Sequence, residues 1–314
     1  MDNQPDAQPS NHRSADRSAR PDFVIIGAMK CATSTIHDQL AHQDGISMSE
    51  PKEPNFFSDE EHWGKGLGWY ESLFASMPQD DLKGESSTHY TKLPTYAQCA
   101  SRLHDHLPDV RLIYVMRDPI ERIVSQYIHE WSVHAIPDGC SIDEAIRAYP
   151  MLVEYSRYAM QLEPYVELFG RDAILPVFFE RVMRSPQGEI ERIAEHIGYT
   201  GTARWVDDDA KNVSSQRQRR SPMLDKVLDM KAVQIARRTL MPEALRAKIR
   251  SRWTMDERPV LSKDSIAYLG EQLEPEMEIL GRHLGLELSC ANFKERVLGE
   301  STIGWDDGLG DGHG

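Results

Sequence analysis

The sequence lacks three features that define large classes of protein. Its four cysteines stand far apart, and no two of them have the C-x-x-C spacing of zinc sites or redox motifs. No apolar run approaches the roughly 18 residues that a membrane-spanning helix needs. The 314 residues carry a formal net charge of −14, which argues against a general affinity for polyanions. We therefore expect reduced thiols, no bound metal, no membrane span and no nucleic-acid partner.

The first residues also lack the apolar stretch of a secretory signal peptide. Residues 1–21 are polar and rich in Ser, Pro, Asp and Arg, which predicts a disordered tail. Residues 299–314 end in a stretch of Gly and Asp, and we expect a second, flexible tail there. The remaining residues, 22–298, are predicted to form a single domain. With no signal or membrane-spanning segment in view, a cytoplasmic location is expected.

Within this domain, short apolar runs alternate with helical patterns. The apolar runs Phe23–Ile26, Val110–Met116 and Ala173–Phe178 are typical of buried strands. This alternation predicts an α/β fold, with a P-loop-like parallel sheet flanked by helices on both faces and a helical C-terminal part. Ligands of such sheets bind at the carboxyl ends of the strands. The predicted helices are Thr95–His106, Glu154–Phe169, Gln187–His196, Met223–Leu240 and Asp264–Leu284.

The loop after the first predicted strand has the composition of an anion-binding turn. Small residues let backbone N–H groups approach an anion, and Lys30 adds a positive charge. The loop differs from a Walker A loop, because Lys30 precedes the hydroxyl cluster by three residues. A polar turn whose Ser or Thr caps the following helix is the alternative. After Gly27, the loop consists of Ala28, Met29, Lys30, Cys31, Ala32, Thr33, Ser34 and Thr35.

A second candidate for anion binding closes the strand predicted at 110–116. Arg117 stands at its carboxyl end, and Pro119 suits the first turn of a helix that carries Ser125. The forked guanidinium group of arginine matches the geometry of phosphate. The alternatives are that Arg117 pairs with Asp118 or a helix end, and that Ser125 is an ordinary surface serine.

Together the two segments resemble the family of sulfotransferases that use 3′-phosphoadenosine 5′-phosphosulfate (PAPS). In that family a K-x-G-T-[ST] loop holds the 5′-phosphosulfate, and an R-D-P-x-x-R-x-x-S segment holds the 3′-phosphate. The family usually has Gly where this chain has Ala32. The resemblance covers about Phe23–Gly198. Three further blocks match its heparan-type and bacterial branches in the expected order: Lys52–Phe57 (K-E-P-N-F-F), Gly66–Tyr70 and Gly84–Tyr90.

The resemblance implies which residues bind the donor PAPS. It places Arg117 and Ser125 at the 3′-phosphate. Relatives also place a basic loop over this phosphate, so one of Arg217, Arg219 or Arg220 is expected to close on it. No metal is implied, because cations and N–H groups hold the leaving phosphate. The residues implied around the 5′-phosphosulfate are Lys30, Cys31, Ala32, Thr33, Ser34 and Thr35.

The chemistry that the resemblance implies is in-line transfer of the sulfuryl group to an acceptor hydroxyl or amine. Lys30 then stabilises charge that develops on the bridging oxygen, and Glu53 acts as the general base. Glu50 is the alternative base. Glu85 and His89 are further candidates, for which a structural role is favoured.

The acceptor is expected to be a small molecule, a lipid or a glycan. Heparan-type relatives often carry Lys where this chain has Ser86, which argues against a polysulfated glycan. The acceptor pocket is expected around 62–70, 129–140 and the C-terminal helices. No oligomeric state is indicated. Aromatic residues that could line the pocket or belong to the core are Trp63, Trp69, Trp131 and Tyr155.

Two other functions fit the same fold. A P-loop kinase of small molecules would show the G-K-[ST] order and an acidic magnesium ligand after a strand, and the sequence lacks the first and gives no convincing case of the second. A non-catalytic nucleotide-binding protein would bind the same ligand, but replacing Glu53 would change nothing. We expect a sulfotransferase, because several motifs follow one another in the order of that family.

Overall fold

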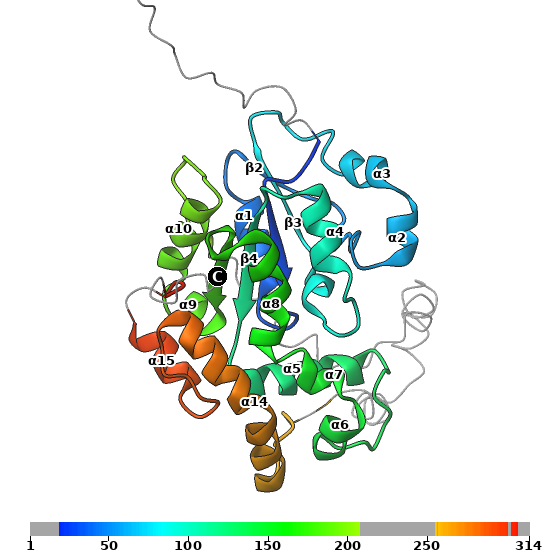
Figure 1. The fold of residues 1–314 in the computed structure, drawn as a ribbon, viewed down its shortest axis with the longest axis vertical. Helices are drawn as coiled ribbons and strands as arrows, with labels where there is room; N and C mark the ends of the chain where they lie inside the picture. Colours follow the sequence, from blue (N-terminus) through cyan, green and yellow to red (C-terminus); the bar gives the residue numbers. More distant parts are fainter. Residues whose placement is uncertain (1–18, 208–254, 256, 301–302, 307–314) are drawn as a thin grey trace, which may run out of the picture.

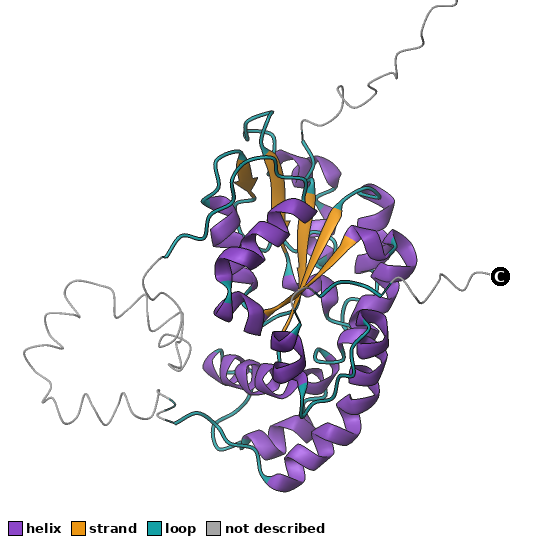
Figure 2. Ribbon diagram, turned by 90° about the vertical axis from the view of Figure 1, so that its left-hand side faces the viewer, coloured by secondary structure: helices purple, strands orange, loops and turns teal. Residues whose placement is uncertain are grey.

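Five parallel strands form the centre of the fold (Figure 1, Figure 2). The computed structural model describes residues 19–207, 255, 257–300 and 303–306. Within these residues the strand order is β2-β3-β1-β4-β5, and every neighbouring pair is parallel. The strands are β1 (Phe23–Gly27), β2 (Ile46–Met48), β3 (Leu82–Ser86), β4 (Arg111–Met116) and β5 (Ile174–Phe178).

Helices cover both faces of this sheet, as predicted (Figure 2). On one face α1 (Thr33–Ala41) packs beside α10 (Pro186–His196), and on the other α4 (Cys99–His106) packs beside α8 (Tyr158–Phe169). The long helix α14 (Lys263–Leu284) lies against α8. The remaining described helices are α2 (Glu60–Gly64), α3 (Leu67–Ser72), η1 (Thr88–Thr91), α5 (Pro119–Ser132), α6 (Ile142–Ala148), α7 (Met151–Glu154), η2 (Arg171–Ala173), α9 (Phe179–Arg184) and α15 (Phe293–Gly299).

The three strands expected from apolar runs are confirmed as β1, β4 and β5. All five residues of β1 are buried, and so are the last five of β4. Side chains on both sides of these strands are covered by helices, so a continuous apolar sequence is stable there. The strands that the sequence did not reveal are β2 and β3. Their residues are mostly small or polar, and Lys83 and Glu85 of β3 are nevertheless buried.

The predicted helix from Glu154 is interrupted, because α7 ends there and α8 begins at Tyr158. The buried guanidinium group of Arg122 gives the reason, since it donates hydrogen bonds to the Leu152 carbonyl (3.2 Å) and the Ser156 hydroxyl (2.6 Å). A buried charge needs such partners. The segment therefore leaves the helical path to supply them.

The C-terminal part is helical where it is described, and α14 matches the helix predicted at 264–284. The helix predicted at 223–240 and the first eighteen residues lie outside the described residues. Residues 303–306, which belong to the tail predicted to be flexible, pack against the domain. Ile303 is buried there, and the Trp305 indole N–H donates to the Ile174 carbonyl of β5 (2.7 Å).

The strand order indicates a position for a ligand at the carboxyl ends of the central strands β1 and β4. The chain runs from β1 to β2 and β3 on one side of β1, and then to β4 and β5 on the other. Such a reversal leaves a crevice at the carboxyl ends of the strands beside it. The loops after β1 and β4 are therefore neighbours.

Candidate active site

The loop after β1 begins in a fixed backbone conformation. Gly27 has a positive φ of 154°, and a Cβ atom there would lie 1.9 Å from the Thr91 hydroxyl oxygen. Thr91 itself donates to the Ile26 carbonyl (2.8 Å), and the Ala28 N–H donates to the Val115 carbonyl of β4 (2.8 Å). Only glycine fits at position 27, and the loop is tied to both η1 and β4.

The same loop then turns sharply into α1. Lys30 and Ala32 have left-handed backbones, with φ of 71° and 70°. Within the described residues no side chain caps α1, whose first turn contains Thr33, Ser34 and Thr35. Unpaired N–H groups at a helix N-terminus form a site for anions. A left-handed residue at position 32 also explains why glycine suits this place in the family motif.

Lys30 follows β1, which pairs with β4, and Arg117 directly follows β4. Burial lowers the pKa of Lys30, and the charge of Arg117 acts in the same direction. The carboxylate of Glu130 on α5 opposes these effects. Electrostatic effects of this kind weaken with distance. The fold therefore brings together the two segments that the sequence predicted to bind one ligand.

Arg117 occupies the predicted place at the carboxyl end of β4. The Tyr158 hydroxyl donates to its backbone carbonyl (2.7 Å), and its guanidinium carbon lies 4.5 Å from the centre of the Phe179 ring. The guanidinium group also pairs with Glu121 in the first turn of α5 (3.4 Å). Ser125 lies further along α5 and is half-buried. Arg117 is thus held by its backbone, while its side chain contacts a neighbouring helix.

Two cations that the sequence analysis missed gather beside Arg117. Arg258 forms an ion pair with Glu121, and Lys294 of α15 lies 3.7 Å from the same carboxylate and 3.8 Å from Asp118. Both come from the C-terminal part of the chain, far from Arg117 in sequence, so no local motif predicts that they lie near it. The arginines expected there, Arg217, Arg219 and Arg220, lie outside the described residues.

Glu53 lies directly beside the loop after β1. The Lys52 ammonium donates to the Ser34 hydroxyl (2.9 Å) and to one oxygen of Glu53 (3.1 Å). The Thr88 hydroxyl donates to the other oxygen (3.3 Å). Phe56 and Phe57 are fully buried and anchor this segment in the core. The side chain of Lys52 therefore bridges Glu53 and Ser34.

A further buried cation, Lys92, faces the same space. Burial lowers its pKa to about 8, and the carboxylates of Glu53 and Glu130 oppose the shift. Burial also lowers the pKa of His129, and Lys30 acts in the same direction. The sequence analysis did not single out Lys92. His129 and Glu130 lie in the segment 129–140 that was expected to contribute to the acceptor pocket, but only the fold brings them near Lys30 and Lys92.

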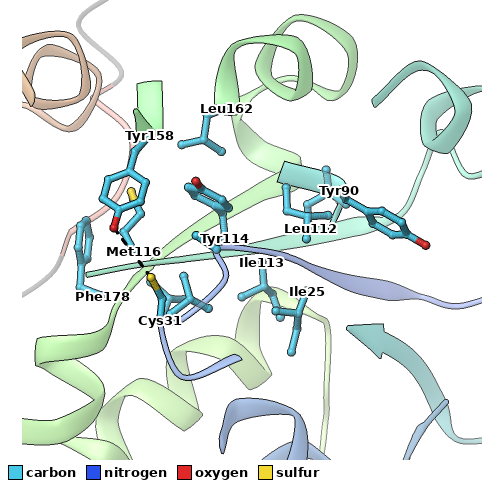
Figure 3. Close-up of a cluster of buried hydrophobic side chains, with 14 of the residues drawn as sticks. Ile25, Cys31, Tyr90, Leu112, Ile113, Tyr114, Met116, Tyr158, Leu162 and Phe178 are labelled. Atoms are coloured by element: carbon cyan, nitrogen blue, oxygen red, sulfur yellow. Dashed lines mark hydrogen bonds between the residues drawn. The ribbon is translucent and has the colours of Figure 1, made fainter. Parts of the chain in front are cut away.

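The side chains of the remaining predicted candidates take other positions: two are buried, one is half-buried and one is exposed. The Cys31 thiol is buried and points toward the Tyr158 hydroxyl (3.9 Å) among hydrophobic side chains (Figure 3), and burial raises its pKa to about 11. Burial raises the pKa of Glu85 to about 7, and burial lowers the pKa of His89, which stacks on a tyrosine ring, to about 4. Glu50 is exposed.

The aromatic residues near 62–70 pack mainly against the buried rings of Phe56 and Phe57. Trp63 and Trp69 both contact the buried ring of Phe56, at centroid distances of 5.2 and 5.9 Å. Trp131 and Tyr155 are buried, and the Tyr155 hydroxyl is 2.6 Å from that of Thr95.

In the part of the chain that is described, no group of His, Cys, Asp and Glu side chains has the arrangement of a metal site. No helix described here has both the length and the apolar character needed to cross a membrane.

Comparisons with known proteins agree with the predicted family. Residues 20–281 match the family model described as the sulfotransferase domain. Over 189 residues, 57% of this chain and 46% of the relative, the sequence is 31% identical to heparan sulfate glucosamine 3-O-sulfotransferase 3B1 of Mus musculus. It is 29% identical over 188 residues to heparan sulfate glucosamine 3-O-sulfotransferase 6 of Homo sapiens, covering 57% of this chain and 52% of that protein. The chain therefore spans about half the length of these curated relatives.

A solved structure supports the same assignment. The sulfotransferase of Alicyclobacillus acidocaldarius is 25% identical and superposes with a TM-score of 0.53, covering 70% of this chain and 94% of that one. The family match, the parallel sheet and the order of the motifs all point to one group of transferases. The chain belongs to the sulfotransferase domain family.

Proposed function

We propose that this chain transfers the sulfuryl group of PAPS to an acceptor hydroxyl or amine. The observation that carries the proposal is the position of Glu53, a candidate base, beside the anion-binding loop after β1. Lys52 contacts Glu53 and, at the same time, Ser34 in the first turn of α1, which follows that loop. A base must lie within hydrogen-bond reach of the proton that it removes, so it has to stand next to the donor.

The residues after β1 and β4 suit a donor with two separate anionic groups. Lys30 and the N–H groups at the start of α1 would hold the 5′-phosphosulfate. Arg117 and Ser125 would hold the 3′-phosphate, with Arg258 and Lys294 close by to add positive charge. These cations lie at one edge of a chain whose overall charge is negative, which concentrates the attraction at the site.

Transfer then follows from the arrangement of charge around the donor. The acceptor oxygen or nitrogen attacks the sulfur, and the bond between sulfur and the bridging phosphate oxygen breaks. Glu53 takes the proton of the acceptor, and Lys30 stabilises the negative charge that grows on the bridging oxygen. The leaving group is 3′-phosphoadenosine 5′-phosphate (PAP).

The acceptor is proposed to be a glycan, a small molecule or a lipid. The named relatives are heparan sulfate glucosamine 3-O-sulfotransferases, which makes glucosamine-containing glycans the first class to test. Ser86 lies behind the Glu53 segment as the hydrogen-bond partner of buried His37 (2.9 Å) and adds no positive charge for a polysulfated chain. A cytoplasmic location stays a prediction, which fractionation of the native cell would test.

The donor site is tested by calorimetric titration of the purified chain with PAP. ATP and 5′-AMP serve as control ligands, and Lys30→Ala and Arg117→Ala as variants. We expect binding that depends on the 3′-phosphate and weakens in both variants. A preference for magnesium-ATP would support the kinase instead.

Catalysis is tested with [³⁵S]PAPS and a panel of acceptors: glucosamine, glucosamine-containing oligosaccharides with and without sulfate, phenols and long-chain alcohols. The wild type should label at least one acceptor, and Glu53→Gln should label none at a comparable rate. Equal labelling by both proteins would remove Glu53 from the mechanism. Tight PAP binding without labelling of any acceptor would favour a non-catalytic protein.

A further inference from the structure

Lys52 connects two parts of the site that come from distant segments of the chain. Its ammonium group lies 2.9 Å from the Ser34 hydroxyl in the first turn of α1, and 3.1 Å from Glu53 Oε1. The Lys52 and Glu53 side chains are about a quarter and a third exposed. Both side chains of the pair are therefore accessible to solvent.

The contacts of Glu53 leave its carboxylate little freedom. One oxygen accepts from Lys52, and the other accepts from the Thr88 hydroxyl of η1 (3.3 Å). The carboxylate is thus held from two sides, by the segment before α2 and by the helical turn after β3. Among the described residues, removing Lys52 would leave the Thr88 hydroxyl as the remaining hydrogen-bond donor to this carboxylate, which could then rotate about that contact.

The backbone around Glu53 shows that its position is maintained against local preference. Glu53 and Asn55 have left-handed φ angles of 57° and 51°. This conformation is disfavoured for a residue such as Glu53, less so for asparagine, and it persists only where surrounding contacts impose it. Here the Asn55 N–H donates to the Ser87 hydroxyl (3.1 Å), and buried Phe56 anchors the chain. The segment is held in a shape that turns Lys52 and Glu53 toward α1.

We propose that Lys52 is a positioning residue for sulfuryl transfer, which aligns the base Glu53 with the donor by linking its carboxylate to Ser34. The inference rests on the proposed function. The alternative is an ordinary surface ion pair, which contributes little to stability and nothing to the reaction. The two readings differ in what happens to the rate when the lysine is replaced.

The test compares Lys52→Met and Lys52→Arg with Arg20→Met. Arg20 is the control for loss of a surface ion pair, because it pairs with the Glu71 carboxylate (3.0 Å) and lies outside the segments expected to bind donor or acceptor. Each protein is titrated with PAP and assayed with [³⁵S]PAPS and the panel acceptor that the wild type labels fastest. We expect PAP affinity to change less than about threefold in all three variants. In Lys52→Met, kcat should fall by about 10²-fold, the loss that misplacement of a reacting group produces, with little change in the KM for PAPS.

Two comparisons separate positioning from a structural role. Lys52→Arg should have a higher kcat than Lys52→Met, because arginine keeps the charge and can donate to both the Ser34 hydroxyl oxygen and Glu53 Oε1. Adding Lys52→Met to Glu53→Gln should cause little further loss, because a residue that acts through Glu53 has no effect once the carboxylate is gone.

Several results would overturn the inference. A kcat in Lys52→Met equal to that of Arg20→Met would do so, and so would losses that multiply in the double variant. A large fall in PAP affinity in Lys52→Met would assign the lysine to donor binding instead. Failure of the wild type to label any acceptor would overturn the proposed function itself, and this inference with it.

Discussion

The donor end of the proposed site is held through its own backbone groups, whereas the base end is held through the side chain of Glu53. The loop after β1 is tied to β4 through Ala28 and Val115, and Arg117 is fixed through its own carbonyl group. At the base end, Glu53 depends on the side chains of Lys52 and Thr88. Replacing the side chain of a donor-end residue leaves its backbone contact in place, whereas replacing Lys52 or Thr88 removes a contact of Glu53. We therefore expect substitutions at the base end to lower mainly the rate of transfer, and substitutions at the donor end to weaken mainly the binding of PAP.

The largest expected effect contrasts Glu53→Gln with Arg117→Ala. Removing the general base should lower kcat by about 10²–10⁴-fold while PAP affinity stays close to that of the wild type. Removing Arg117 should weaken PAP binding by about 10–100-fold, since a hydrogen bond to a charged group contributes about 1.5–3 kcal/mol. Calorimetry and initial rates measure the two properties separately. If both variants changed both properties alike, the distinction between the two ends would be lost.

The second prediction concerns Glu85, the buried carboxyl group of β3 beneath the base segment. Its pKa is raised by burial from 4.5 to about 7 in the folded protein, so the folded state prefers the neutral form. The free energy of unfolding should therefore contain a contribution that is complete below pH 4.5 and is lost as the pH rises to about 7. The loss amounts to about 3 kcal/mol.

Glu85→Gln should remove this contribution to the pH dependence. Urea unfolding at about pH 5 and pH 8 measures it, with the exposed Glu50→Gln as the control. The difference in stability between Glu85→Gln and the wild type should shift in favour of the variant at the higher pH. Parallel pH profiles for all three proteins would show that Glu85 ionises normally in the folded state.

A third prediction tests how firmly the donor loop is built. Gly27→Ala should cost about 1–3 kcal/mol or more, because the added methyl group would collide with the Thr91 hydroxyl. Gly66→Ala is the matched control, since Gly66 also has a positive φ (78°) but no atom lies within 4 Å of its Cβ position. Denaturant unfolding should show the larger loss in Gly27→Ala. Equal losses would mean that backbone conformation alone, and not the contact with Thr91, requires glycine at position 27.

The smallest effect is expected at Ala32, at the start of α1. Its left-handed backbone should make Ala32→Gly neutral or more stable, by up to about 1 kcal/mol. Ala28→Gly, in the same loop but without a positive φ, should instead be destabilising. Thermal unfolding of both variants measures the difference. A stability loss in Ala32→Gly that equals the loss in Ala28→Gly would contradict the strain at position 32.

The two ends also differ in how well the sequence predicted them. Apolar runs identified β1 and β4, because a strand covered on both faces has a simple composition, and the loops that follow each strand are contiguous motifs. The strand β3 escaped detection, since Lys83 and Glu85 resemble surface residues, yet neighbouring elements bury both. Gly84 did not indicate a strand either, although a Cβ atom there would lie 2.2 Å from the Phe23 ring of β1.

The sequence by itself determined the family, the alternation of strands and helices, and the residues after β1 and β4, because each of these depends on segments of the chain that are local. Only the tertiary structure decided what surrounds them. It brought Arg258 and Lys294 to Glu121 beside Arg117, and it set Lys52 between Ser34 and Glu53. Ion pairs and hydrogen bonds between distant segments depend on where the backbone places both partners. A local pattern specifies only one of them.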